Sequence, residues 1–378
     1  MSKMSRKNIR RYESENLSWN RRRDSDLPAQ NTRGARCTVH CDLCDAWVCL
    51  VCLTAASMTA RVSNPCRFGH EAMRTQFELT LDMPERDEAS LRGIAEEVWS
   101  EIDRIERALS PHQDESDLAA INTARGIPVA IGGSAFSFLL VAQELARATS
   151  CACDPTVGAI TRLLRAPEPP TEQALQSVRQ SIGFDAVVTI NNERRTVTMA
   201  PGAMLDPGAL GKGFALDAAR HLLTELGVTR AMLHGGTSSV LTLGHWRIAI
   251  EAPPGMPVEG ILATVVLDNA MLSVSAAHGR VFAWPDGSTG HVVDPRTGTP
   301  ARGTRLCAVV LPHSGPRSSH PGTAAEAWST ALMVLGATGL ETLAAQHPDA
   351  ASLVLGDDAT VKTLGAEFAV RGASLARP

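Results

Sequence analysis

The order of its strand-like segments constrains the fold of this 378-residue chain more than any other feature. Residues 186–200 alternate apolar and polar side chains around a central Asn-Asn pair, which is typical of a β-hairpin. Further segments of strand character follow with few helices between them, at 230–236, 245–253, 260–275, 304–312 and 350–356. A Rossmann sheet would need strict alternation of strands and helices. We therefore predict an α+β fold with mixed, largely antiparallel sheets and several packed helices.

Apolar side chains at strand or helix spacing locate the other elements. Phe77, Leu79 and Leu81 alternate with polar residues and predict a half-buried strand at the start of the domain. Between residues 86 and 109 the spacing predicts an amphipathic helix whose buried stripe is Leu91, Ile94, Ala95, Val98, Ile102, Ile105 and Leu109. Later helices are expected at 138–149, at 325–336 after a polar loop, and after Lys212 with an inward face of Phe214, Ala218, Leu222, Leu223 and Leu226.

Composition and charge limit the classes of protein to which the chain can belong. The net charge of -4 provides no general basic surface, so we predict that the protein does not bind nucleic acid. The apolar run at residues 46–58 is too short to cross a bilayer, and we expect no transmembrane segment. The run has the apolar character of a signal-peptide core, but an unusually long basic region precedes it. A cytoplasmic location is favoured, and a periplasmic one stays open if translation starts later.

The N-terminal residues differ in composition from the rest of the chain. The first 36 residues contain ten Lys or Arg and four Asp or Glu, without apolar periodicity. Six of the nine cysteines lie between Cys37 and Cys66. Two Cys-x-x-Cys pairs within residues 41–52 permit a metal site, although the four residues between the pairs are few for a zinc knuckle. We predict a poorly ordered, basic, Cys-rich leader over residues 1–67 and one domain over residues 68–378.

A Gly-Lys-Gly turn at residues 211–213 leads into one predicted helix and suggests a phosphate site. The loop of nucleoside triphosphatases has the pattern Gly-x-x-x-x-Gly-Lys-Ser/Thr. Here Asp206 stands at the first glycine position, and Gly213 follows Lys212 where a hydroxyl residue is required. The triphosphatase interpretation therefore fails at two positions. The stretch still has the form of a phosphate site, because the N-terminus of a helix attracts anions.

Six segments, in this order, resemble the signature motifs of the ApbE family of FAD:protein FMN transferases. They are AMRTQFE at 72–78, SDLAAIN at 116–122, DPTVG at 154–158, LDPGALGKGFALDAA at 205–219, GHVVDPRTGTP at 290–300 and AEAWSTALMVLG at 325–336. The resemblance covers nearly the whole domain and implies a T-fold-like core. It also implies an Mg²⁺-dependent enzyme that transfers FMN from FAD to a Thr or Ser hydroxyl of an acceptor protein and releases AMP. Acceptors in the family are subunits of membrane electron-transfer complexes that carry an Asp-x-x-Ser/Thr-Gly-Ala-Thr sequence.

The resemblance also implies roles for individual residues. The metal ligands would be Glu326, Thr330 and the backbone carbonyl of Ala209, and oxygen ligands of this kind suit Mg²⁺. Glu326 and Thr330 stand four positions apart, on one face of a predicted helix. The residues in contact with FAD would be Met73, His112, Ala152, Cys153, Asp154, Asp206, Lys212 and Val292.

The implied reaction requires an acceptor hydroxyl to lose its proton, and His291 is the candidate general base. Asp294 is expected to orient it. Each motif also has a purely structural interpretation. His291 and Asp294 could form only a turn, SDLAAIN only a helix cap, and Glu326 only a solvated acid in the first turn of a helix.

Three residues depart from the family pattern. Glu326 replaces the usual Asp, His112 stands where an aromatic ring often stacks on the flavin, and Thr237 replaces the acid of a Gly-Gly-Asp turn. These changes are compatible with FAD binding and leave the catalytic activity open. The alternatives are a protein that binds or hydrolyses FAD without transferring FMN, and a metal-binding adaptor that uses the Cys-rich leader.

Overall fold

The computed structural model describes residues 65–371, apart from residues 167, 257–259, 279–280, 285–286, 315–318 and 366–367. All of these belong to one unit of the chain, Cys49–Pro378. The predictions for the Cys-rich leader, its paired cysteines included, fall on residues before 65 and lie outside the described part. The first strand, β1 (Cys66–Ala72), begins two residues before the predicted start of the domain.

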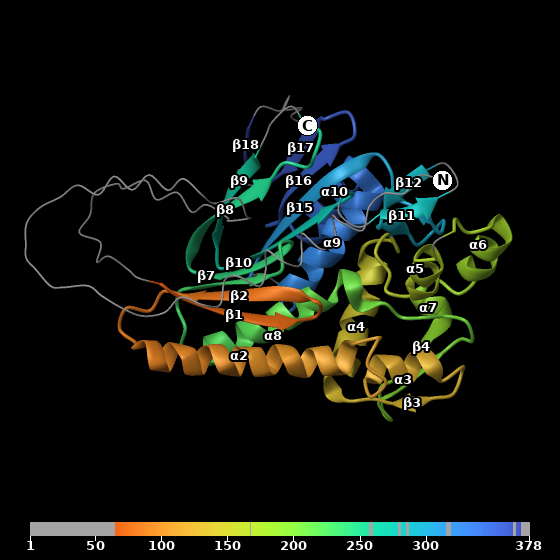
Figure 1. The fold of residues 1–378 in the computed structure, drawn as a ribbon, viewed down its shortest axis with the longest axis horizontal. Helices are drawn as coiled ribbons and strands as arrows, with labels where there is room; N and C mark the ends of the chain where they lie inside the picture. The colour runs from red at the N-terminus through yellow and green to blue at the C-terminus, as the bar shows by residue number, and fades with distance from the viewer. Residues whose placement is uncertain are drawn as a thin grey trace, which may run out of the picture. The chain divides into compact units, whose positions relative to one another are not determined.

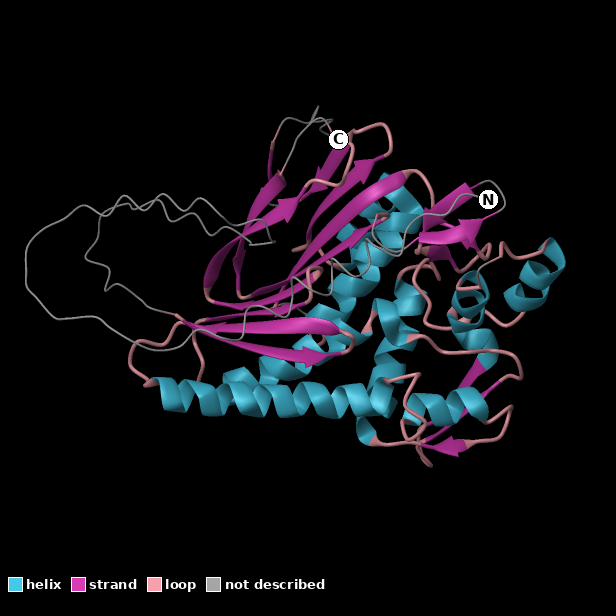
Figure 2. Ribbon diagram, viewed as in Figure 1, coloured by secondary structure: helices cyan, strands magenta, loops and turns pink. Residues whose placement is uncertain are grey.

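An eight-stranded sheet forms the centre of the fold, as Figure 1 and Figure 2 show. Each strand is antiparallel to its neighbours. From one edge to the other the order is β1, β2 (Thr75–Leu81), β6 (Ala231–Gly235), β7 (Ser239–Leu243), β10 (Ala270–Ala276), β15 (Thr304–Pro312), β16 (Ala351–Gly356) and β17 (Val361–Leu364). The predicted α+β fold with largely antiparallel sheets is confirmed.

Both faces of this sheet are covered, because alternate side chains of its strands enter two separate cores. Leu233 and Leu241 belong to the core beneath the helices α8 (Gly211–Glu225) and α9 (Pro321–Leu335). Met232 and Val240 belong to the opposite core. That second core is closed by a small sheet of three strands, β8 (His245–Glu251), β9 (Ile261–Asp268) and β18 (Ala369–Val370). Burial on both sides explains why β15 is an almost continuous apolar run.

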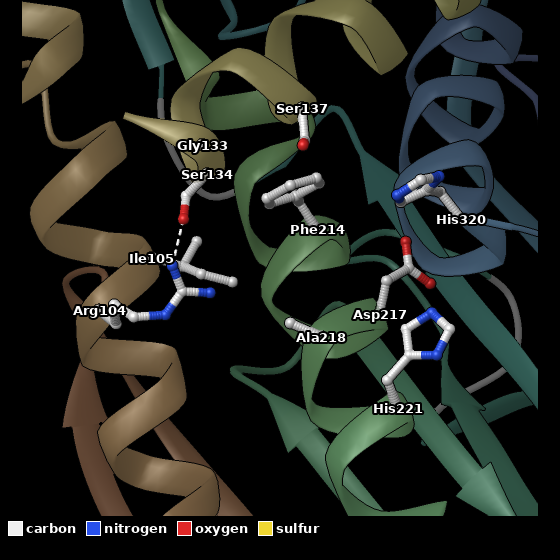
Figure 3. Close-up of a pocket in the computed structure, with 10 residues that line it drawn as sticks. All are labelled: Arg104, Ile105, Gly133, Ser134, Ser137, Phe214, Asp217, Ala218, His221 and His320. Atoms are coloured by element: carbon white, nitrogen blue, oxygen red, sulfur yellow. Dashed lines mark hydrogen bonds between the residues drawn. The ribbon is translucent and has the colours of Figure 1, made fainter. Parts of the chain in front are cut away.

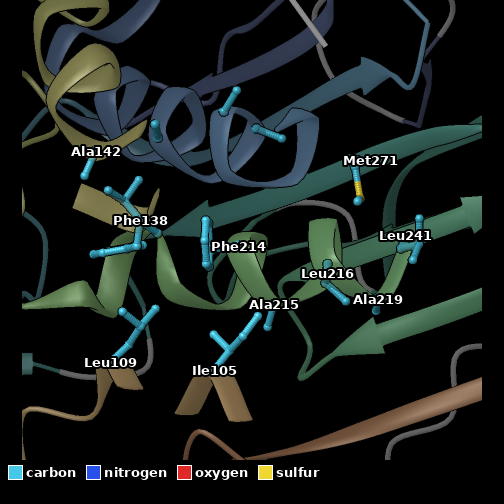
Figure 4. Close-up of a cluster of buried hydrophobic side chains, with 14 of the residues drawn as sticks. Ile105, Leu109, Phe138, Ala142, Phe214, Ala215, Leu216, Ala219, Leu241 and Met271 are labelled. Atoms are coloured by element: carbon cyan, nitrogen blue, oxygen red, sulfur yellow. The ribbon is translucent and has the colours of Figure 1, made fainter. Parts of the chain in front are cut away.

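Helix α8 lies between the sheet and α2 (Glu88–Leu109), and one of its aromatic rings meets α4 (Gly133–Ala148). Phe214 of α8 packs edge-on against Phe138 of α4, with 5.5 Å between the ring centroids (Figure 4). The apolar stripe predicted for α2 is confirmed, because each of its seven residues is at most 5% exposed. The helix predicted at 138–149 is confirmed as α4, which starts five residues earlier.

The inward face predicted for α8 is partly wrong. Ala218, Leu222 and Leu226 are only half-buried, whereas Ala215 and Leu216 are fully buried. Because α8 has α2, α9 and the sheet as neighbours, a single apolar stripe does not describe its burial.

The remaining elements connect and flank these layers. The hairpin predicted at 186–200 is confirmed as β4 and β5, but its turn lies at residues 192–195 and uses Arg195 at a φ of 48°. The bounds are α3 (Asp117–Thr123), β3 (Val129–Ala130), α5 (Gly158–Leu164), α6 (Glu172–Arg179), α7 (Phe184–Val187), β4 (Val188–Asn191), β5 (Thr196–Met199), η1 (Pro207–Ala209), β11 (Val281–Trp284), β12 (Gly287–Gly290), β13 (Val293–Asp294), β14 (Thr299–Pro300), η2 (Gly336–Thr338) and α10 (Gly339–Gln346).

The last long helix, α9, starts at Pro321, four residues before the predicted start at residue 325. Proline is well suited to the first position of a helix, because the N–H group that it lacks would have no partner within the helix there. None of the helices between residues 65 and 371, in the ranges given above, combines the length and apolar character needed to cross a bilayer.

Candidate active site

Helices α8 and α9 meet near their N-terminal ends, at Gly213 and Gly322. A Cβ atom on Gly213 would lie 2.3 Å from the carbonyl oxygen of Gly322, and one on Gly322 would lie 2.7 Å from the carbonyl oxygen of Gly213. Both distances are too short for real atoms, so only glycine fits without a backbone shift. The close approach brings the side chains near each glycine to the same place.

Each of these two helices caps the N-terminus of the other. The Glu326 carboxylate of α9 accepts a hydrogen bond from the Gly213 N–H at 2.8 Å. In return, Asp217 of α8 accepts hydrogen bonds from the N–H groups of Gly322 and Thr323 at 2.7 and 2.8 Å, and from the Thr323 hydroxyl at 2.7 Å. The residues at the N-cap positions of both helices make no side-chain capping bond. The two carboxyl groups therefore accept hydrogen bonds from N–H groups of the first turns, which have no partner within their own helices.

Glu326 lies at the centre of this contact and is 3% exposed. Its Oε1 forms an ion pair with Lys212 Nζ at 3.0 Å and accepts a hydrogen bond from the Ser239 hydroxyl at 2.5 Å. Its Oε2 has the Gly213 N–H as its single donor within the described residues. The interpretation of Glu326 as a solvated acid in the first helical turn is therefore wrong. A carboxylate oxygen can accept two bonds, so Oε2 keeps one accepting position.

Thr330 lies one turn of α9 beyond Glu326, as their spacing predicts. Its hydroxyl is 3.5 Å from that of Ser275 on β10, which lies 2.9 Å from the Ser329 hydroxyl. Ser329 is also 3.0 Å from the Ser273 hydroxyl and donates to the carbonyl oxygen of Glu326 at 3.1 Å. A row of hydroxyl groups thus joins β10 to α9 and holds Thr330 in place beside the Glu326 turn.

The segment before α8 forms one turn of 3-10 helix, Pro207–Ala209, and then breaks at Leu210, where φ is -134°. Asp206 caps this turn through a backbone N–H two residues later, at 2.9 Å, and lies 3.7 Å from the Arg165 guanidinium. Ala209 therefore lies outside α8, as the last residue of this short 3-10 turn. A backbone carbonyl in such a turn is not committed to the hydrogen-bond pattern of a long helix.

Residues 152–154 lie inside the protein, and each is at most 3% exposed. Asp154 accepts hydrogen bonds from the Thr156 N–H and hydroxyl at 2.8 and 2.6 Å and from the Phe184 N–H at 2.8 Å. Burial raises the pKa of the Cys153 thiol, which keeps it protonated and unreactive. The side chains of Ala152 and Cys153 pack in the core, so contact between this segment and FAD would use its backbone.

The turn between β1 and β2 carries Met73 and lies beside His112. Met73 and Arg74 have φ angles of 50° and 60°, which residues other than glycine rarely adopt. Two successive positive φ values are required by a type I′ hairpin turn. Arg74 Nη1 is 3.5 Å from His112 Nε2. Arg74 therefore links the turn that carries Met73 to His112, and turns with positive φ at residues other than glycine cluster at functional sites.

His291 precedes the short strand β13, and Asp294 ends it. His291 is exposed, and Val292 packs against the main hydrophobic core. Both oxygens of Asp294 accept hydrogen bonds from the Arg296 guanidinium, at 2.9 and 2.8 Å, and Oδ1 also accepts the Arg296 N–H at 2.9 Å. These contacts agree with the turn interpretation of the segment. The roles of His291 as general base and of Asp294 as the residue that orients it stay predictions.

A cavity of about 440 Å³ lies beside α8 (Figure 3). On α8, its lining residues Phe214, Asp217, Ala218 and His221 lie about half a turn around the helix from Lys212. None of the predicted site residues lines it. The cavity therefore belongs to a different face of α8 from the Lys212–Glu326 pair.

Burial raises the pKa of Asp217 to about 7, although its hydrogen bonds to Thr323 and Gly322 and the charge of Arg220 act in the opposite direction. The native protein therefore holds a proton at pH values where the unfolded chain, with an ordinary Asp pKa of 3.8, has lost it.

We predict that this group makes the free energy of unfolding fall as the pH rises from 3.8 to about 7. The stability linked to a raised carboxyl pKa is complete below the unfolded value and is lost towards the folded value, at up to about 1.4 kcal/mol per pH unit. Denaturant unfolding of the natural protein and of Asp217→Asn across this pH range measures the difference. Parallel stability curves for the two proteins would show that Asp217 does not titrate there.

The fold and the site together define an antiparallel α+β domain in which a buried carboxylate and a lysine meet between two helix N-termini. A sequence profile of the ApbE family matches residues 73–354. The chain belongs to the ApbE family.

Relatives and solved structures agree with this membership. The FAD:protein FMN transferase of Treponema pallidum (strain Nichols) is 28% identical over 300 residues, which cover 73% of this chain and 81% of the relative. That of Haemophilus influenzae is 27% identical over 270 residues, covering 66% and 76%. The structure of the ApbE protein of Thermotoga maritima matches with a TM-score of 0.68 at 23% identity, over 79% of this chain and 96% of the other. Pseudomonas stutzeri flavinyl transferase ApbE, in its apo form, matches with a TM-score of 0.66 at 20% identity, over 79% and 93%.

Three residues of this site were not predicted from the sequence: Ser239, Asp217 and Gly322. Ser239 belongs to the Gly-Gly-Thr-Ser-Ser turn, in which the family pattern singles out only Thr237, as the replacement of an acid. Asp217 lies inside one of the six motifs and on an otherwise buried face of α8, where an acid is rare. An acid among buried positions of a helix could have identified Asp217, from the sequence, as a residue with a buried polar partner.

Proposed function

We propose that this protein is an Mg²⁺-dependent FAD:protein FMN transferase, which moves FMN from FAD to a Thr or Ser hydroxyl of an acceptor protein. The observation that carries the proposal is the ion pair between the half-buried Lys212 and the buried Glu326, 3.0 Å apart, within the segment that matches the ApbE family. Relatives of the chain bear the name of this activity. The contacts around the pair suit Lys212 to the pyrophosphate of FAD and Glu326 to a metal ion.

Lys212 and the N-terminus of α8 suit the pyrophosphate of FAD. The Lys212 side chain is 23% exposed, so its ammonium group can reach a ligand while its stem stays packed. It lies in the first turn of α8, where the helix dipole also attracts anions. Asp206, at the preceding turn, would accept a hydrogen bond from the cofactor. The flavin end would lie towards Met73 and His112.

The residues around Glu326 suit Mg²⁺. Glu326 Oε2, the Thr330 hydroxyl and the Ala209 carbonyl are hard oxygen ligands, and Oε2 has one accepting position left. Within the described ranges, no three His, Cys, Asp or Glu side chains gather as metal ligands. A cation here would therefore share its coordination with phosphate oxygens of the substrate, as Mg²⁺ commonly does. When bound, Mg²⁺ would offset the negative charge that develops on the phosphoryl oxygens.

The chain's own residues would bind the substrate and move one proton. The acceptor hydroxyl oxygen attacks the phosphorus of the FMN half of FAD, and the bond from that phosphorus to the AMP half breaks. AMP leaves with the electron pair of the broken bond. The hydroxyl proton passes to a ring nitrogen of His291, because an imidazole is the side chain that most often acts as a general base. Lys212 holds the two phosphates in position during the exchange.

The acceptor would be a flavoprotein subunit of a membrane electron-transfer complex. This step of the proposal follows from the family resemblance alone. The motif expected around the modified residue is Asp-x-x-Ser/Thr-Gly-Ala-Thr. The exposed position of His291 is compatible with an acceptor that approaches from solvent.

Incubation with FAD, Mg²⁺ and a peptide that carries this motif tests the proposal. We expect intact-mass spectrometry to show one FMN adduct per peptide, with release of AMP, and no adduct when EDTA is present or when both hydroxyl residues of the motif are replaced by Ala. If FAD binds but no divalent metal supports an adduct, the transferase assignment is lost. Release of FMN and AMP without an adduct would favour the alternative of FAD hydrolysis.

A further inference from the structure

Ser239 and Lys212 share one oxygen atom of Glu326. The Ser239 hydroxyl donates to Oε1 at 2.5 Å, and Lys212 Nζ lies 3.0 Å from the same atom. Ser239 is 1% exposed and is the first residue of β7, in the middle of the eight-stranded sheet. Its position is therefore set by the sheet, whereas Lys212 has a long side chain that reaches solvent.

This difference matters once Lys212 turns towards a phosphate group. Glu326 would then lose its only cationic partner among the described residues while it stays buried. A buried charge without partners is costly, and a hydrogen bond to a charged group contributes more than one between neutral groups. Only the Ser239 hydroxyl and the Gly213 N–H would still hold the carboxylate.

The extra length of Glu326 makes this arrangement possible. An Asp side chain, which is usual at this position in the family, is one methylene shorter. From the α9 backbone, Glu326 reaches both β7 and the first turn of α8. Thr237, two residues before Ser239, replaces the acid of the family turn, so the turn itself offers no second carboxylate.

We propose that Ser239 is a positioning residue, whose hydroxyl holds the Glu326 carboxylate in place when Lys212 leaves it for the pyrophosphate of FAD. The inference rests on the proposed function, because it requires a phosphate ligand at Lys212. It adds a role for the Ser-Ser end of the turn, and it explains why a buried serine faces the carboxylate. Ser239 itself would touch neither FAD nor the reacting atoms.

Binding of FAD to the full-length protein in EDTA tests the inference without any catalysis. We expect Ser239→Ala to weaken FAD binding about tenfold, because Glu326 would keep a single hydrogen bond when Lys212 departs. Added Mg²⁺ should restore part of this loss, since a cation can replace Lys212 at the carboxylate. A general packing defect would not respond to the metal in this way.

Ser352→Ala is the matched control. Ser352 lies on β16 of the same sheet, is fully buried, and donates its hydroxyl bond to the carbonyl oxygen of Ala308 at 2.9 Å. The same atom is removed, but Glu326 is not affected. We expect the FAD affinity of Ser352→Ala to equal that of the natural protein. An equal loss in both variants, or no loss in Ser239→Ala, would overturn the inference.

A ligand-free measurement tests one premise of the inference, namely that Ser239 and Lys212 hold the same carboxylate, and its result does not depend on the proposed function. Denaturant unfolding of Lys212→Met, Ser239→Ala and the double variant shows whether the two residues act on one carboxylate. We expect the unfolding midpoint of the double variant to fall further than the two single shifts together, because Glu326 would keep only the Gly213 N–H. Additive shifts would overturn the role of Ser239. Absence of FAD binding in the natural protein would instead count against the transferase.

Discussion

Replacement of Glu326 by Gln is expected to lower kcat/KM for FMN transfer by more than about 100-fold, because even changes in the residues behind a metal ligand cost 10–100-fold. The variant should also unfold more easily. Gln keeps the volume of the side chain, but one carboxylate oxygen becomes an NH2 group. That group cannot accept from the Gly213 N–H at the Oε2 position, or from Ser239 and Lys212 at the Oε1 position. Loss of one partner from a fully buried ion pair costs about 3–5 kcal/mol, and the cost here should be smaller because the Lys212 side chain reaches solvent. Peptide flavinylation measured by mass, together with denaturant unfolding, tests both effects.

Two further variants separate the causes. Glu341→Gln makes the same substitution at an exposed position of α10 and should leave both transfer and stability unchanged. Glu326→Asp keeps the charge but withdraws it by one methylene from Ser239 and the Gly213 N–H. We expect it to retain transfer and to lose stability, because the cap of α8 weakens. Full transfer activity in Glu326→Gln would remove Glu326 from the proposed metal site.

Much of the fold could be predicted from the sequence, because many local patterns of apolar residues are compatible with only one secondary structure and one buried face. The stripe of α2 is such a case, because a helix with one wet face and one buried face leaves a clear period in the sequence. The strands β6, β8, β15 and β16 fall in predicted segments for a similar reason, whereas the single segment predicted at 260–275 is two strands, β9 and β10, that meet at Asn269. Predictions were poorer for α8, whose burial on several sides leaves no single stripe.

The candidate site was predictable as a set of motifs but not as a geometry. The contact of Lys212 with Glu326 spans more than a hundred positions of the chain, and no local pattern records it. The Gly-Lys-Gly turn suggested a phosphate site, yet nothing in it shows that Gly213 also packs against Gly322. Asp294 was expected to orient His291, and the structure adds Arg296, two residues later, as its partner. Contacts between residues far apart in the sequence, and the choice of partner by the Asp294 carboxylate, can be recognised only from the three-dimensional structure.

The contact between Gly213 and Gly322 leads to the second prediction with a large effect. Gly213→Ala should lower the free energy of unfolding by at least about 3 kcal/mol. The added Cβ would lie 2.3, 2.6 and 2.8 Å from three backbone atoms of residues 322 and 323, and backbone cannot rotate away as a side chain can. The helices would have to separate, so the caps by Glu326 and Asp217 would weaken as well, at about 1 kcal/mol each. FMN transfer should be lost with them, because Lys212 and Glu326 would no longer meet.

Gly93→Ala is the control for this substitution. Gly93 lies on an exposed face of α2, and a Cβ added there meets no atom within 4 Å. Alanine is the better helix former, so this variant should gain about 0.5–1 kcal/mol of stability and keep its activity. Denaturant unfolding of the two variants beside the natural protein gives shifts of opposite sign if the helix contact is as close as the structure shows. A Gly213→Ala protein as stable as the natural one would mean that α8 and α9 separate at little cost, and that their reciprocal caps contribute little to the site.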